Sequence, residues 1–259
     1  MSHPEINSGW LHVHVAGDDP PSVLPVYVAR PSLPGRHPTV LVGFELFGIT
    51  PYIRSVADRI ARQGYTAAVP DFYHRLGRER IELSADAEGR SRGLELLQAL
   101  DRTGVARDAQ AVLDHLSTHP DANRRTAFVG LSVGGHIAFY AATQIPFAAV
   151  AVLYPGWLTD TDIALGRPEP TLGLTPGMAD LGTTLLFLAG DDDRLVTAQA
   201  RDQIADQLRV AGVRHEMVVY PGAPHGFFCH ERDTYRKPVA DDAWRRIAAL
   251  LTAELASTP

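Results

Sequence analysis

The chain contains a single cysteine, Cys229, and no apolar run long enough to span a bilayer. One cysteine excludes an intramolecular disulfide and a zinc site built from several cysteines. The amino-terminal residues, Met-Ser-His-Pro-Glu-Ile-Asn-Ser-Gly-Trp, have neither the basic start nor the apolar stretch of a secretory signal. We therefore expect a cytoplasmic protein that is neither exported nor inserted into a membrane.

Clusters of lysine and arginine are also missing, and the formal net charge is −6. A protein that binds nucleic acid normally offers a basic face to the phosphates. We therefore expect no nucleic-acid partner and a small neutral or weakly charged substrate. The spacing H-E-x-x-H and related metal-ligand patterns do not occur, which argues against metal catalysis.

The chain does contain a regular alternation of apolar runs and amphipathic helical patterns. Residues 11–16 and 23–28 alternate with period two around a Gly-Asp-Asp-Pro-Pro turn, which predicts an antiparallel hairpin. From Val40 onward, buried strands alternate with helices, which predicts an α/β fold with a mostly parallel sheet and helices on both faces. No composition break divides residues 1–259, so we expect one domain, with 1–35 as its hairpin.

The expected elements leave two segments without a clear assignment. Residues 75–104 turn helical only towards their end, and 158–182 form a long irregular segment that we expect to border the substrate. The expected strands are 38–44, 65–71, 127–129, 147–154, 183–189 and 215–220, and the expected helices are 51–64, 105–116, 196–210 and a final one from about Pro238.

The most informative stretch is residues 126–135, Thr-Ala-Phe-Val-Gly-Leu-Ser-Val-Gly-Gly. An apolar run breaks at Gly130, presents Ser132 and resumes as a helical pattern, which gives the strand, tight turn and helix of a nucleophile elbow. Glycines on either side of the serine let strand and helix approach closely. The stretch predicts Ser132 as a nucleophile, and the alternative is an ordinary turn serine.

A serine hydroxyl is barely nucleophilic at neutral pH, so it needs a base and a group that orients the base. In α/β-hydrolases the order along the chain is nucleophile, acid, histidine. Here Asp191, Asp192 and Asp193 follow one later strand and His225 follows the next. The residues alone leave the three aspartates as alternatives for the acid, and His225 as either the base or a histidine that satisfies loop backbone.

Acyl transfer also needs two N–H donors aimed at the developing oxyanion. The amide of Val133, directly after the serine, is one candidate. The second normally comes from the loop after an earlier strand, which is Glu45-Leu46-Phe47, and Leu46 is our candidate.

Five motifs together resemble the dienelactone hydrolase family, and the match runs from about Val40 to the carboxyl terminus. The motifs are Gly-Phe-Glu45-Leu-Phe-Gly, Val-Pro-Asp71-Phe-Tyr73, the elbow with its double glycine, Gly190-x-x-Asp193-x-x-Val, and Tyr220-Pro-Gly-Ala-Pro-His225-Gly-Phe. The resemblance implies a single α/β-hydrolase domain with no large lid, acting on lactones or small esters. From the residues themselves we expect no cofactor and no metal.

The resemblance also assigns roles to residues of this sequence. It implies that Asp193 is the triad acid and that Leu46 and Val133 supply the oxyanion-hole amides. Glu45 corresponds to the family's active-site glutamate, which contacts the resting nucleophile; the alternative is a loop carboxylate in a local salt bridge. Tyr73 is expected to line the pocket.

Two departures from the family pattern bear on the substrate. The name-giving members use a cysteine where this chain has Ser132. They also hold the carboxylate of their substrate with arginines, one of them shortly after the catalytic histidine, where this chain has Phe-Phe-Cys at 227–229. Arg90 and Arg92 are candidates for another cation. We therefore prefer a less charged, more apolar ester or lactone over dienelactone.

The sequence thus predicts a serine hydrolase of small carboxylic esters or lactones, related to carboxymethylenebutenolidase and working as a monomer or homodimer. Because a fold does not fix a function, one alternative is the same fold catalysing cyclisation or acyl transfer in a biosynthetic pathway. A non-catalytic ligand-binding protein on this scaffold is the other.

Overall fold

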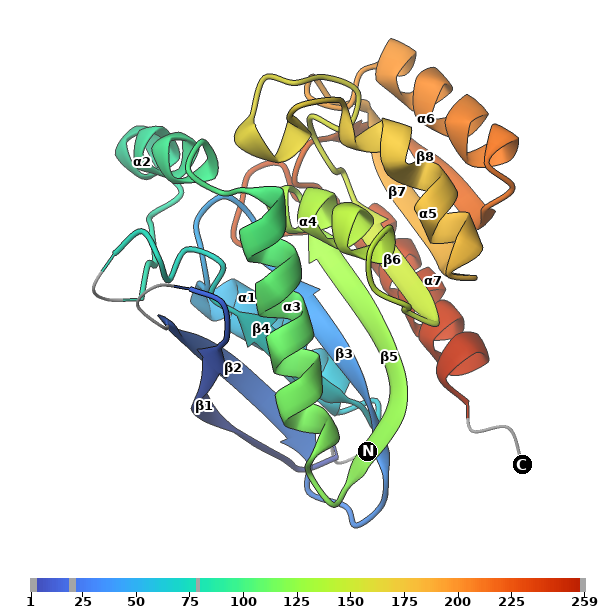
Figure 1. Cartoon of the computed structure of the whole chain (residues 1–259). Coiled ribbons are helices and arrows are strands. Elements are labelled where there is room, and N and C mark those ends of the chain that lie inside the picture. Colours follow the sequence, from blue (N-terminus) through green and yellow to red (C-terminus); the bar gives the residue numbers. More distant parts are fainter. Residues whose placement is uncertain (1–3, 19–21, 78–79, 257–259) are drawn as a thin grey trace.

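The computed structural model describes residues 4–18, 22–77 and 80–256 and contains one eight-stranded sheet in the order β1-β2-β4-β3-β5-β6-β7-β8 (Figure 1). The strands are β1 (Ile6–Val15), β2 (Ser22–Pro31), β3 (His37–Gly43), β4 (Thr66–Pro70), β5 (Ala122–Leu131), β6 (Ala149–Leu153), β7 (Thr184–Asp192) and β8 (Arg214–Pro224). β1 pairs antiparallel with β2, and β2 with β4, whereas all other pairs are parallel. The predicted antiparallel pairing of the first two strands and the mostly parallel sheet are confirmed, and residues 19–21 of the predicted turn lie outside the described residues.

Helices cover both faces of the sheet, as predicted: α3 and α4 lie on one face, and α1 and α7 on the other (Figure 1). The helices are α1 (Pro51–Ala61), α2 (Ala87–Leu97), α3 (Arg102–Ser117), α4 (Val133–Ala142), α5 (Thr175–Asp180), α6 (Ala198–Val210) and α7 (Lys237–Leu255). In the part of the chain that the structure describes, no helix is long and apolar enough to cross a membrane.

The two unassigned segments contain short helices. Residues 158–182 hold two 3₁₀ turns, Ala164–Gly166 and Thr171–Leu174, and the six-residue α5. Helix α2 starts where the Asp86 carboxylate accepts a hydrogen bond from the Gly89 amide at 2.8 Å. Few apolar residues of these helices are buried. The sequence therefore shows little of the hydrophobic periodicity from which a helix is predicted.

The parallel part of the sheet brings the predicted site segments together. Gly43 at the end of β3 is in register with Gly130 on β5, and Gly190 on β7 with Tyr220 on β8. The loops that follow these strands therefore meet at one edge of the sheet, where α/β proteins bind ligands.

Glycines let α4 press directly against β3 and β5. A Cβ on Gly134 would lie 2.2 Å from the carbonyl carbon of Gly43, and one on Gly130 would lie 2.1 Å from the Gly134 oxygen. The Gly134 amide donates to the Phe44 carbonyl at 2.8 Å. The elbow and the loop after β3 are thus held backbone to backbone.

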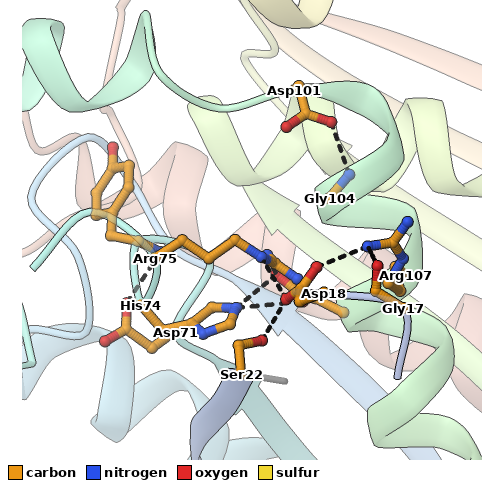
Figure 2. A network of polar contacts seen from close by, with 11 residues as sticks. Gly17, Asp18, Ser22, Asp71, His74, Arg75, Asp101, Gly104 and Arg107 are labelled. Carbon is orange, nitrogen blue, oxygen red and sulfur yellow. Dashed lines mark hydrogen bonds and ion pairs between the residues drawn. The ribbon is translucent and has the colours of Figure 1, made fainter. Parts of the chain in front are cut away.

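A buried polar network fastens the loop after β4 to α3 (Figure 2). Asp108 on α3 is fully buried, and its carboxylate accepts two hydrogen bonds from the Arg75 guanidinium, each 2.7 Å long. His74 Nε2 lies 3.2 Å from both oxygens of the same carboxylate. Arg75 Nε also reaches Asp18 at 2.9 Å, and Arg107 reaches Asp18 at 2.6 Å. Asp18, which follows β1, and the loop after β4 are therefore both held to α3.

We expect Gly134→Ala to lower the free energy of unfolding by about 1–3 kcal/mol, because the added methyl group meets backbone that cannot move aside. Gly9→Ala is the control, since a Cβ there meets no heavy atom within 4 Å. Urea denaturation of both variants measures the difference. Equal midpoints would contradict the close approach of α4 to β3.

Asp108→Ala should cost about 3 kcal/mol of stability, because it removes the buried carboxylate that pairs with Arg75 and with the buried His74 ring. Asp114→Ala, at an exposed position of the same helix, should change stability by less than about 0.5 kcal/mol. Chemical denaturation at neutral pH tests this. The network would be structurally unimportant if the two variants unfolded alike.

Candidate active site

Ser132 stands at the turn from β5 into α4 in a strained backbone conformation. Its φ is 54° and its ψ is −113°, a region that residues other than glycine rarely adopt. Its amide donates to the Leu153 carbonyl on β6 at 2.9 Å, which helps to hold the turn. Such strain costs about 1–3 kcal/mol and persists only where the surroundings enforce it. Here the glycine contacts of α4 enforce it.

Three polar side chains form a continuous relay at this turn. Ser132 Oγ lies 2.9 Å from His225 Nε2, and His225 Nδ1 lies 2.9 Å from Asp193 Oδ2. When the Nδ1–H donates to the carboxylate, Nε2 is left to accept the serine proton. The arrangement can therefore deprotonate the serine hydroxyl.

The carboxylate of Asp193 is well suited to stay ionised. Its side chain is fully buried, and Oδ1 accepts the amides of Leu195 at 2.8 Å and Val196 at 3.1 Å. Burial acts to raise its pKa, but the hydrogen bond and charge of His225, together with those two amides, hold the pKa below its ordinary value.

Among the three neighbouring aspartates, Asp193 is the one whose carboxylate meets His225. Asp191 is exposed and accepts the Gly222 amide at 2.6 Å, which stabilises the turn before His225. Asp192 is exposed at the end of β7, where it is in register with Pro224.

The two amides predicted to bind an oxyanion are both available. Within the described residues, neither the Leu46 amide nor the Val133 amide donates to another protein group. Val133 follows the serine directly, at the start of α4, where helix amides lack internal acceptors. Leu46 lies in the loop after β3, which the bond from Gly134 to Phe44 holds beside the elbow.

Tyr73 lies beneath the Leu46 loop. It is fully buried, its ring centroid is 4.8 Å from that of Phe44, and its hydroxyl donates to the Leu46 carbonyl at 3.2 Å. Burial raises the pKa of this phenol, so the hydroxyl remains a donor at neutral pH. The contacts of Tyr73 are thus with the loop that presents the Leu46 amide.

Glu45 forms a buried ion pair with a distant arginine. One oxygen accepts the Tyr154 hydroxyl at 3.2 Å, and the other lies 2.7 Å from an Arg232 nitrogen, across a sequence separation of 187 residues. Burial raises the pKa of Glu45, and the charge of Arg232 opposes that rise. The family resemblance implies a contact with the nucleophile; here Ser132 Oγ bonds His225 instead.

Arg232 and Tyr154 are site residues that the sequence did not reveal. The Arg232 guanidinium lies 4.7 Å from the Phe47 ring centroid, besides pairing with Glu45. Tyr154 has a φ of 41°, and its ring centroid lies 4.8 Å from that of His225. Tyr154 follows directly after β6, so its strand-end position was a usable signal, whereas no motif marks Arg232.

The two arginines proposed as further cations do not join this cluster. Arg90 and Arg92 are exposed residues of α2, and Arg92 pairs with Glu95 on the same helix at 2.7 Å. The helix itself contacts the Leu46 loop through Gly93, where a Cβ would lie 2.6 Å from Leu46 Cγ.

A small cavity of about 190 Å³ borders the Glu45–Arg232 pair and is also lined by Phe47, Tyr52 and Cys229. Burial raises the pKa of the Cys229 thiol to about 12, so this thiol stays protonated near neutral pH. Across residues 4–18, 22–77 and 80–256, no group of three or more His, Cys, Asp or Glu side chains is placed to hold a metal ion.

Known sequences resemble the chain over nearly its whole length. The profile described as "Dienelactone hydrolase family" matches residues 24–255. A protein of Synechocystis sp., provisionally named carboxymethylenebutenolidase, is 31% identical over 234 residues, which cover 88% of this chain and 91% of that protein. A protein of Yersinia pestis with the same provisional name is 31% identical over 247 residues, covering 93% and 86%.

Solved structures show the same fold. The crystal structure of a provisionally described dienelactone hydrolase from Klebsiella pneumoniae subsp. pneumoniae has a TM-score of 0.83 and 27% identity, and the match covers 96% of this chain and 99% of that one. A dienelactone hydrolase-like promiscuous phosphotriesterase from metagenomic libraries has a TM-score of 0.77 at 20% identity, covering 96% and 98%. The predicted α/β-hydrolase fold without a large lid is confirmed, and the chain belongs to the dienelactone hydrolase family.

Proposed function

We propose that the protein is a serine hydrolase that cleaves small carboxylic esters or lactones through an acyl-enzyme. The observation that carries the proposal is the relay from Ser132 through His225 to Asp193, with both distances at 2.9 Å. Membership of a hydrolase family supports it. No cofactor is needed, because the chain itself supplies the nucleophile, the base and the oxyanion donors.

In the first half-reaction, His225 Nε2 takes the proton from Ser132 Oγ while the oxygen attacks the substrate carbonyl carbon. The carbonyl oxygen becomes an oxyanion and accepts the amides of Leu46 and Val133. The imidazolium, stabilised by the Asp193 carboxylate, gives its proton to the departing alkoxide. The alcohol leaves, or in a lactone stays attached to the acyl chain, and an ester to Ser132 remains.

In the second half-reaction, His225 takes a proton from water, and the hydroxide attacks the acyl carbon. The tetrahedral intermediate uses the same two amides and collapses with Ser132 Oγ as the leaving group. The proton on His225 returns to the serine oxygen, so the free acid and the resting enzyme are formed.

The Glu45–Arg232 pair favours a neutral substrate. Its 2.7 Å contact already satisfies the arginine with a carboxylate, and a substrate carboxylate would have to displace Glu45 or approach it against its charge. The neighbouring Phe47 ring offers an apolar surface. An uncharged ester or lactone therefore suits the site better than dienelactone, which carries a carboxylate.

Ser132→Ala should lower kcat for a short p-nitrophenyl ester by at least about 10³-fold, because the acyl-enzyme cannot form. A fluorophosphonate probe should label the wild type at Ser132 and leave the variant unlabelled. Ser117→Ala, at an exposed position on α3, is the control and should keep wild-type turnover. Equally slow hydrolysis by the wild type and Ser132→Ala, with no labelling of either, would rule the mechanism out.

Asp193→Asn should reduce kcat by about 10⁴-fold with little change in stability, because the amide disturbs the tautomer and charge of His225. Asp191→Asn and Asp192→Asn should stay within about twofold of the wild type, since asparagine keeps an oxygen acceptor at these exposed positions. Steady-state kinetics on the three variants compares them. Near-normal turnover by Asp193→Asn would show that another group orients the base.

A further inference from the structure

A second, larger hollow lies between α1 and α7, apart from the catalytic relay. Its volume is about 710 Å³, within the range of small-molecule sites, and neither Ser132 nor His225 lines it. Both helices cover the sheet face opposite α3 and α4 (Figure 1). The proposed hydrolysis does not involve the residues that line this hollow.

Aromatic rings form the floor of the hollow. Phe228 and Trp244 have ring centroids 5.0 Å apart, and the Tyr52 hydroxyl donates to the Phe228 carbonyl at 3.0 Å. All three residues are buried, so the floor is packed and fixed before any ligand arrives. Tyr235 completes the aromatic lining at a more exposed position.

Two arginines supply positive charge at the rim, Arg59 on α1 and Arg62 directly after the end of that helix. Arg59 and Arg62 are both exposed, and the Arg59 guanidinium lies 4.1 Å from the Trp244 ring centroid. Within the described residues, neither guanidinium makes a hydrogen bond or an ion pair. The carboxylate that lines the hollow, Asp241, is bonded to Lys237 at 2.6 Å.

In this respect Arg59 and Arg62 differ from the described arginines that hold loops in place. Arg75, Arg107 and Arg232 each lie within 3 Å of a carboxylate oxygen. Partial burial lowers the pKa of Arg59, while the charge of Asp241 opposes that change. A guanidinium that has lost some water without gaining an acceptor favours an incoming anion.

We propose that this hollow is a second binding site, for an organic anion with a flat aromatic body, such as an aromatic carboxylate. The carboxylate would accept hydrogen bonds from the two guanidinium groups in their fork geometry, and the flat body would lie against the aromatic lining. Because the net charge of the chain is −6, attraction for the anion comes from these local charges and not from the protein as a whole.

The test measures binding of 2-naphthoate and of its uncharged counterpart, 2-naphthalenemethanol, by calorimetry with the full-length protein. We expect 2-naphthoate to bind at least tenfold more tightly than the alcohol. The double variant Arg59→Gln/Arg62→Gln should lose that preference. A control double variant, Arg209→Gln/Arg214→Gln, removes the same charge from exposed surface positions and should keep it.

Two further measurements distinguish loss of the proposed site from unfolding of the variant and from binding elsewhere on the protein. Arg62→Gln alone leaves the Arg59–Trp244 contact in place, and it should weaken 2-naphthoate binding by about threefold to tenfold without a change in melting temperature. In NMR spectra, 2-naphthoate should shift the indole N–H of Trp244, which a Trp244→Phe variant assigns among the three tryptophans.

Several results would overturn the proposal. They are equal affinities for the acid and the alcohol, retention of the preference in the arginine double variant, and a shift confined to Trp157 in the loop after β6. Sedimentation velocity adds one more: self-association that the arginine substitutions abolish, without probe binding at any protein concentration, would mean that a second copy of the chain covers the hollow.

Discussion

Ser132 has a positive φ, which is unfavourable for a residue other than glycine. The rest of the site depends on Ser132 keeping that conformation. The turn is possible because Gly134 has no side chain to separate α4 from Gly43 on β3. The same contact places the loop after β3 beside the serine through the bond from Gly134 to Phe44. One close approach of backbone therefore fixes both Ser132, the proposed nucleophile, and the loop that carries the Leu46 amide.

Three buried carboxylates of the molecule each have specific partners. Asp193 is matched by His225 and two amides, Glu45 by Arg232 and Tyr154, and Asp108 by Arg75 and His74. Such pairs contribute less to stability than their number suggests, because removing each group from water is costly. Their value here is positional. The first two pairs join loops that follow different strands, and the third joins the loop after β4 to α3, so these segments are held in fixed positions.

The sequence predicted those features whose cause is local or lies at the end of a strand. Ser132, His225 and the aspartate cluster were predictable because each follows an apolar strand and the chain order matches the hydrolase pattern. Arg232 was not, since its contact with Glu45 depends on how the segment after His225 folds back, which no periodicity encodes. Packing between elements that are far apart in the chain produces the short helices α2 and α5 and the hollow between α1 and α7. Short sequence motifs do not encode such packing, so these features could not be predicted.

The Glu45–Arg232 pair also bears on the order in which parts of the chain fold. Glu45 emerges early in synthesis and its counterion comes 187 residues later. Packing the loop after β3 before the carboxyl-terminal segment docks would bury a carboxylate without a partner, which is energetically unfavourable. The relay has the same dependence, because His225 arrives after the elbow. A nascent or truncated chain that lacks β8 and the loop after it therefore has Ser132 without its contact to His225, and the proposed hydrolysis requires that contact.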